Sequence, residues 1–194
     1  MIGSGLFALG SAPWLGDQLG TVGANVAFFV GAWFFTAGAF IQLALSGPYR
    51  SEAPGHIGLR AAWLAAAVQL LGTLLFNIST GAALHSQSVR AERLDVWVPN
   101  AEGSVAFLIS ACIAMIPMLR DGQYWRPTSP GWLSTWFNML GSIAFGVSSV
   151  GAIILTNGEL LNATLASAGT FVGALFFLAT SGVMLPTAHT GRHA

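Results

Sequence analysis

The chain has 194 residues, of which 54% are apolar and only 7% are charged, and its mean hydropathy is +0.69. Soluble domains carry about a quarter charged residues, so this composition indicates a protein whose main solvent is lipid. Seven Arg without Lys balance seven Asp and Glu, which excludes a basic surface for nucleic acid. Cys112 is the only cysteine, which excludes an internal disulfide and a cysteine metal cluster, and we expect it to be a small core residue.

Six apolar stretches have the character of membrane helices, which need about 20 mainly apolar residues. In chain order they are Met1–Leu15, Thr21–Ser46, Leu59–Leu84, Asn100–Leu119, Gly131–Leu155 and Leu160–Leu185. The first is short, and no basic segment precedes it, so we expect a retained helix and not a cleavable signal peptide. The segments between them are rich in turn formers and charge and are predicted to be loops, among them Gly16–Gly20, His85–Pro99 and Thr156–Glu159. Since backbone groups find no water in lipid, the sequence predicts a single all-α polytopic membrane domain over residues 1–194.

Arginine placement predicts the orientation, because short loops rich in Arg stay on the cytoplasmic side. Alternate loops and the tail hold Arg50, Arg60, Arg120, Arg126 and Arg192, whereas the opposite side holds Arg90 and Arg93. Both termini are therefore predicted to be cytoplasmic. The absence of Lys favours a G+C-rich bacterial genome, so we expect a multi-pass protein of the bacterial inner (plasma) membrane.

An internal repeat joins the helices in pairs. Trp63-Leu64 recurs as Trp132-Leu133, Gly72-Thr73 as Gly141-Ser142 and Phe76 as Phe145, each pair 69 residues apart, and the same offset backwards leads to Gly3-Ser4 and Phe7. The pattern predicts six transmembrane helices arranged as three parallel hairpin repeats, over residues 1–48, 59–119 and 131–186, with a tail at 187–194. The equivalent of Trp63 would precede Met1, which favours a coding start upstream over a first helix that is truly short.

The second helices of the three units match more loosely. Phe28 with Gly31-Ala32 aligns with Phe107 and Ser110-Ala111, and with Phe171 and Gly173-Ala174. Small residues let membrane helices approach closely. The predicted packing positions are Gly3, Ser4, Gly72, Thr73, Gly141, Ser142, Gly169 and Gly173. The alternative is that the Gly-Ser/Thr step unwinds a helix to bind a solute or ion.

This unit pattern, Gly-Ser/Thr with Phe four residues after the Gly and then a second helix with Phe and Gly-Ala, resembles the YrhK-like domain of bacterial membrane proteins. Residues 1–48 carry it best, through Gly3-Ser4, Phe7, Phe28-Phe29, Gly31-Ala32 and Gly38, whereas Ser110 replaces the Gly in the second unit. The resemblance implies a two-helix membrane module without an assigned activity.

Polar residues inside a membrane are the candidates for function, because they are costly to hold there. Gln69 and Asn138 occupy equivalent repeat positions and could face a shared centre, although hydrogen bonding between helices is the reading we favour for them and for Asn25. Glu102 lies near the outer end of its helix, where the helix dipole favours an acid.

No pattern for catalysis is present. The four histidines, His56, His85, His189 and His193, fall in loops or the tail, and no nucleophile motif or phosphate loop occurs. We therefore predict no enzyme activity and no cofactor. The expected function is that of a structural or interaction module, or an accessory subunit, with the lipid bilayer and a homo-oligomer or larger membrane complex as partners. The alternative is a small-solute or ion transporter or channel with its pathway between the three hairpins, in which polar residues would form an inward stripe.

Overall fold

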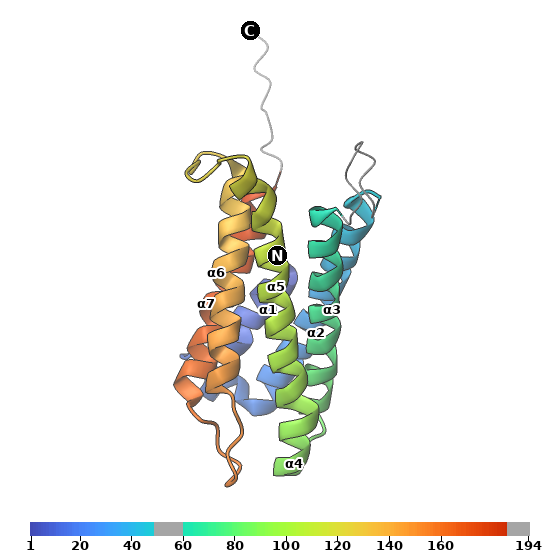
Figure 1. Ribbon diagram of the computed structural model, residues 1–194. Helices are drawn as coiled ribbons and strands as arrows, with labels where there is room; N and C mark the ends of the chain where they lie inside the picture. The colour runs from blue at the N-terminus through green and yellow to red at the C-terminus, as the bar shows by residue number, and fades with distance from the viewer. Residues whose placement is uncertain (49–59, 186–194) are drawn as a thin grey trace.

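The computed structural model describes residues 1–48 and 60–185, and within them the chain is helical apart from its connections. The helices are α1 (Ile2–Ser11), α2 (Gly16–Leu45), α3 (Ala61–Ala83), α4 (Val89–Ala91), the π-helical turn η1 (Glu92–Trp97), α5 (Val98–Arg120), α6 (Pro130–Gly151) and α7 (Ala163–Val183). The long helices stand side by side as one bundle (Figure 1). Arg50, Arg192, three of the four histidines and the tail lie outside the described residues.

Helix α1 and the five longer helices form a closed circle. In the described residues each contacts the next in the order α1, α2, α3, α5, α6, α7, and α7 contacts α1. In Figure 1 the α5–α6 connection lies at the upper end of the bundle, α4 and the α6–α7 turn lie at the lower end, and Met1 lies between the two ends. The circle gives the bundle a central axis, which a flat row of hairpins would not have.

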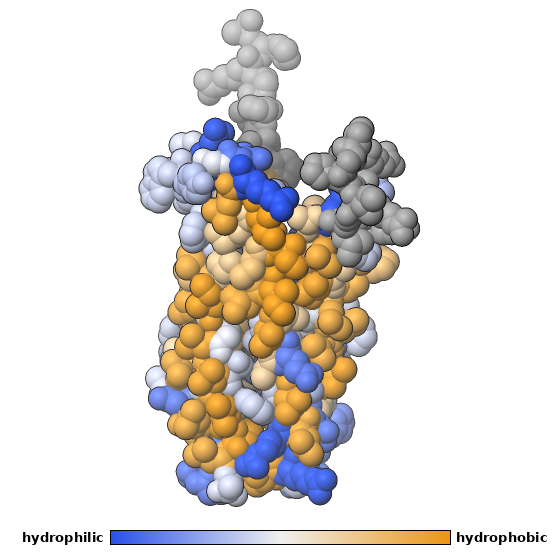
Figure 2. All heavy atoms as spheres, viewed as in Figure 1, coloured by the Kyte–Doolittle hydropathy of each residue, from blue (hydrophilic) through white to orange (hydrophobic). Residues whose placement is uncertain are grey.

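Four of the described helices are long and apolar enough to cross a membrane, within Gln18–Leu45, Ala61–Ala83, Val89–Arg120 and Ala163–Val183. Apolar residues cover most of the face shown in Figure 2, with hydrophilic residues gathered at its ends. Helix α1 has 10 residues and would cover about 15 Å of a core about 30 Å thick. Helix α6 has 22 residues and is long enough, but polar residues such as Ser134, Thr135 and Asn138 lower its mean hydropathy, and it is not among the four. It ends at Gly151 and not at the predicted Leu155. Residues 152–155 form a turn in which Ile154 pairs with Leu160.

The predicted loop His85–Pro99 is mostly helical, which corrects the sequence-based prediction. Ser88 caps α4 by accepting a hydrogen bond from the Ala91 backbone N–H, and α4 and η1 lead directly into α5. Pro99 has no N–H to donate to the preceding turn, and the wide π turn lies immediately before it. The predicted loop Gly16–Gly20 also belongs to a helix, with a break at Gly20, where φ is 62°.

Cys112 is exposed on α5, whereas the neighbouring Ala111 is only 1% exposed. The expectation that Cys112 is a core residue is therefore wrong. Successive residues of a helix point about 100° apart, so Ala111 takes the inward position and Cys112 faces away from the bundle.

Candidate functional site

Helix α1 and the five longer helices all carry the same five-residue pattern, which is Gly, then Ser, Ala or Thr, then two variable residues and Phe. The copies are Gly3–Phe7, Gly31–Phe35, Gly72–Phe76, Gly103–Phe107, Gly141–Phe145 and Gly173–Phe177. The small residue after each glycine is at most 2% exposed. The pattern therefore directs the same face of every helix toward the interior.

The glycines meet in pairs where the two helices of each hairpin cross. A methyl group on Gly3 would lie 2.8 Å from the carbonyl oxygen of Gly31, one on Gly72 would lie 3.1 Å from that of Gly103, and one on Gly141 would lie 3.2 Å from that of Gly173. Only glycine allows the two backbones to approach this closely. Each crossing then fixes where the phenylalanine one turn further along the helix lies.

The second-helix alignment from sequence is wrong for the middle hairpin. Gly103, and not Ser110, lies at the crossing with Gly72, and Phe107 is the equivalent of Phe35 and not of Phe28. The shift is seven residues, or about two helical turns, so it retains the same helix face. Ser110 instead donates a hydrogen bond from its hydroxyl to the Ala65 carbonyl, 2.7 Å away.

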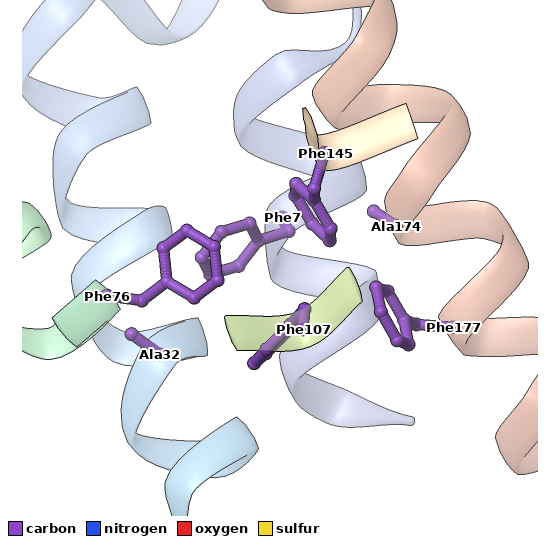
Figure 3. Close-up of a cluster of buried hydrophobic side chains, with 7 residues drawn as sticks. All are labelled: Phe7, Ala32, Phe76, Phe107, Phe145, Ala174 and Phe177. Atoms are coloured by element: carbon purple, nitrogen blue, oxygen red, sulfur yellow. The ribbon is translucent and has the colours of Figure 1, made fainter. Parts of the chain in front are cut away.

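The six phenylalanines form a layer across the bundle axis, which we call the phenylalanine layer. The rings from α1, α3 and α6 contact one another, with centroid distances of 6.4 Å for Phe7 and Phe76, 6.0 Å for Phe7 and Phe145 and 5.7 Å for Phe76 and Phe145. Figure 3 shows Phe107 and Phe177 beside them, 5.5 Å apart, and all five rings are at most 5% exposed. Phe35 completes the layer 5.2 Å from Phe7.

On one side of the layer lies a polar cavity of about 220 Å³, which we call the amide cavity. Phe35 and Phe177 form part of its wall, and both Gln69 and Asn138 line it. Its other polar lining residues are Ser4, Gln42, Thr73, Thr180 and Ser181. The two amides that the sequence placed at equivalent positions therefore share one space.

On the other side lies a cavity of about 210 Å³, the capped cavity, whose wall includes Phe7, Phe76 and Phe145. Trp97 of η1 and Ile154 of the α6–α7 turn also line it. Trp97 donates its indole N–H to the Ser149 carbonyl at 2.9 Å, and an Arg93 guanidinium nitrogen donates to the Ile154 carbonyl at 2.9 Å. These bonds hold the π-helical segment and the turn together beside the cavity.

The other two predicted polar residues, Asn25 and Glu102, lie in different surroundings. Asn25 lines the capped cavity, and its amide nitrogen donates to the Ala83 carbonyl at 3.1 Å. Glu102 is exposed on α5 and lines neither cavity. Of the predicted packing positions outside the three crossings, Gly169 lies against α6, because a methyl group there would be 2.9 Å from the Ala144 carbonyl oxygen.

Two polar residues of the capped cavity, Asn100 and Thr170, are absent from the sequence-based candidates. Each stands three residues before the glycine of its helix, as Gln69 and Asn138 do. The two helices of a hairpin run in opposite directions. The position three residues before the glycine therefore lies on one side of the phenylalanine layer in the first helix and on the other side in the second helix. Aligning the second helices on the glycine would have found both residues.

The side chains around both cavities are uncharged, and the described residues contain no group of three potential metal ligands. Met1 also lines the amide cavity, and its N-terminal ammonium donates a hydrogen bond to the Ser181 hydroxyl at 3.5 Å. The Gln69 side-chain oxygen is buried and has no hydrogen-bond partner within the described part of the chain. A buried acceptor without a donor costs about 1–3 kcal/mol.

Comparison with protein-family models, with curated proteins and with solved structures finds no match for this chain. The resemblance of residues 1–48 to the YrhK-like domain stays a prediction.

Proposed function

We propose that this chain is an integral membrane protein in which three parallel hairpin repeats, α1 with α2, α3 with α5 and α6 with α7, enclose a pathway for a small solute. The six helices would each enter the membrane, with α1 covering part of its depth. The pathway would follow the bundle axis, from the amide cavity through the phenylalanine layer to the capped cavity.

The observation that carries this proposal is that the two cavities lie on opposite sides of one shared layer of rings. Gln69 and Asn138 line one cavity and Asn100 the other, whereas the hydroxyl of Thr170, which also lines the second cavity, is hydrogen-bonded to the Ser148 hydroxyl at 2.7 Å. A purely structural bundle would use its amides to join helices, as Asn25 does, whereas a pathway needs polar groups directed into space. A layer of packed aromatic rings blocks such a pathway until the helices move apart.

The arginines of the described residues support one orientation. Arg60, Arg120 and Arg126 belong to one end of the bundle and Arg90 and Arg93 to the other. The side with more arginine would face the cytoplasm of a bacterial cell. The amide cavity would then open toward the cytoplasm and the capped cavity toward the outside.

Solute flux tests the proposal. The purified protein is placed in liposomes, and stopped-flow light scattering follows the entry of a panel of small neutral and charged solutes. We expect protein-dependent flux of at least one solute above that of protein-free liposomes. Flux equal to that of protein-free liposomes for the whole panel, from a protein shown to be folded and inserted, would contradict the pathway.

A second function is favoured by one further feature, an outward groove between α2, α3 and α5. Small residues line much of it, among them Gly38, Ser46, Ala62, Ala65 and Ala114, and such residues let another membrane helix approach closely. The chain would then be an accessory subunit or part of a homo-oligomer. Purification in mild detergent with mass spectrometry tests this, since a stoichiometric partner lost on Ala62→Phe substitution would support it and a lone monomer would exclude it.

A further inference from the structure

We propose that a solute dissolved in water enters the capped cavity from the side, through an opening between α2 and α7 that we call the lateral portal. Thr21 of α2 and Ser167 of α7 form its mouth, because both line the opening and both are exposed. The inference rests on the proposed function, since the capped cavity is the outer end of the proposed pathway. It adds the place of entry and the residues that line it.

The portal is a groove that is continuous with the capped cavity. It lies at the C-terminal end of α1, which contributes Gly10 and Ser11, and α2 and α7 form its sides. The groove and the cavity have several lining residues in common, so a molecule in the groove already touches the wall of the cavity. The shared residues are Asn25, Phe28, Asn100, Ala152, Leu160 and Thr170.

The sequence opens the bundle at this place because α1 ends early. Helix α1 ends at Ser11, and the next residue, Ala12, is extended, with φ −64° and ψ 122°. Pro13 explains this conformation, since a proline disfavours the helical conformation of the residue before it. The equivalent of Ser11 in the second hairpin is Thr80, where α3 continues to Ala83. Helix α1 therefore covers less of the space between its neighbours α2 and α7 at this end.

Hydrogen bonds bridge the other boundaries of the capped cavity. Between α2 and α3, the Asn25 amide nitrogen donates to the Ala83 carbonyl at 3.1 Å. Between η1 and α6, the Trp97 indole N–H donates to the Ser149 carbonyl at 2.9 Å. Helices α2 and α7 are not neighbours in the helix circle, and their described residues make no hydrogen bond with each other. The groove between them is thus the boundary that can admit a solute without breaking a bond.

The surroundings of the mouth favour water over lipid. The α6–α7 turn, which carries Leu160 of the groove, holds the exposed pair of Asn157 and Glu159, whose amide nitrogen and carboxylate oxygen are 2.7 Å apart. A carboxylate is costly inside the hydrocarbon core, so this turn belongs at the water-exposed surface. Within the described part of the chain, the hydroxyls of Thr21 and Ser167 have no protein hydrogen-bond partner and are free to bind water or a solute.

Asn100 lies where the groove meets the cavity, since it lines both. Its side chain is half-buried, and its carboxamide has no hydrogen-bond partner among the described residues. A carboxamide can both donate and accept, so Asn100 can bind an entering solute at this junction. A thiol in its place would report whether molecules reach the cavity from water.

Thiol labelling tests the portal. Asn100→Cys is made in a Cys112→Ala background, because the natural cysteine is exposed, and the protein in lipid nanodiscs is treated with a charged, membrane-impermeant methanethiosulfonate. Intact-mass spectrometry follows the rate. We expect labelling that Ser167→Trp and Thr21→Trp, each added separately, slow several-fold by filling the mouth. Val172→Trp is the matched control, because Val172 is 44% exposed on α7 and does not line the groove.

Two results would overturn the inference: no labelling of folded Asn100→Cys protein, or labelling that both mouth variants leave at the rate of the Val172→Trp control. Thermal unfolding midpoints show that each variant is folded, and the two mouth variants, on different helices, check each other. Labelling that depends on the mouth, without flux in the liposome experiment, would refute the pathway and leave the portal. Flux that both mouth variants leave intact would refute the portal and leave the pathway.

Discussion

Single glycines determine how closely the helices of this bundle can approach. At Gly169 an added methyl group would lie 2.8 Å from Cβ and 2.9 Å from Cα of Ser148, so the contact is with the backbone of α6 and not with a movable side chain. Gly146, also in the middle of a helix, has open space around the same position. Alanine substitutions at these two glycines therefore separate the effect of helix packing on stability from the effect of helix propensity.

We expect Gly169→Ala to lower the free energy of unfolding by about 1–3 kcal/mol, because α6 and α7 must separate to admit the methyl group. Gly146→Ala should be neutral or slightly stabilising, since alanine favours the helix over glycine. The measurement is the thermal unfolding midpoint of both variants in the same detergent. Equal midpoints for the two variants would show that the crossing is looser than the contacts at Gly169 indicate.

Hydroxyls at the helix crossings add directed bonds to this packing. Ser148 donates its hydroxyl to the Ala166 carbonyl at 2.6 Å, and Ser79, its equivalent 69 residues earlier, donates to the Val96 carbonyl at 2.8 Å. Ala166 and Val96 each stand seven residues before the glycine of their helix. Hydrogen bonds between membrane helices contribute about 0.6–2 kcal/mol, so these serines support the glycine crossings without replacing them.

At the scale of whole elements, the segment before α5 differs most from its sequence-based description. Residues 89–97 carry Arg90, Glu92, Arg93 and Asp95, and this charge indicated a loop. The backbone is nevertheless helical, and Trp97 and Arg93 bind carbonyls of α6 and of the following turn. Charged side chains do not prevent helix formation at the end of a bundle. Water can reach the charged groups there, while the backbone hydrogen bonds are made within the helix.

Hydrogen exchange measures this element directly. We expect the amides of residues 89–97 to exchange much more slowly than those of the 121–129 connection, because helical bonds protect them. Trp97→Phe removes the donor to the Ser149 carbonyl and should accelerate exchange in residues 89–97 while leaving the middle of α3 unchanged. Fast exchange of residues 89–97 in the unmodified protein would show that this segment is a loop, as the sequence predicted.

Helix positions were predictable where apolar length alone determines them, as for α2, α3 and α5. The end of α6 was not, because Ala152–Leu155 is as apolar as a helix interior and only the pairing of Ile154 with Leu160 shows that it turns. Their common repeat position allowed Gln69 and Asn138 to face one space, and both line the amide cavity, although the sequence-based prediction favoured hydrogen bonds between helices for them. The capped cavity did not follow, because the second helices were aligned on Phe28 and Phe107 and the misalignment by two turns concealed Asn100.

At the scale of the whole molecule, closure of the helix circle places six similar helices around one common axis. The contact between α7 and α1 completes the circle, and Trp14 near the α1–α2 turn lies against Phe171 of α7 with ring centroids 5.3 Å apart. Only with this closure do phenylalanines of the first and last hairpins meet, as Phe7 and Phe145 do. The layer is thus a property of the arrangement, and no single hairpin could form it.

The most direct test of the account is solute flux through liposomes containing a variant with an opened layer. Phe145→Ala removes a ring that lines the capped cavity and contacts four other rings of the layer, at a cost in stability of about 3–5 kcal/mol. Phe145→Leu is the milder version, and Phe40→Ala is the control, because Phe40 is 62% exposed on α2.

If the layer closes a pathway, folded Phe145→Ala and Phe145→Leu proteins will pass at least one solute of the panel faster than the unmodified protein does, and Phe40→Ala will not differ from the unmodified protein. If folded Phe145 variants leave the flux at the level of the Phe40→Ala control, the two cavities are not parts of one pathway, and the layer serves only to pack the bundle.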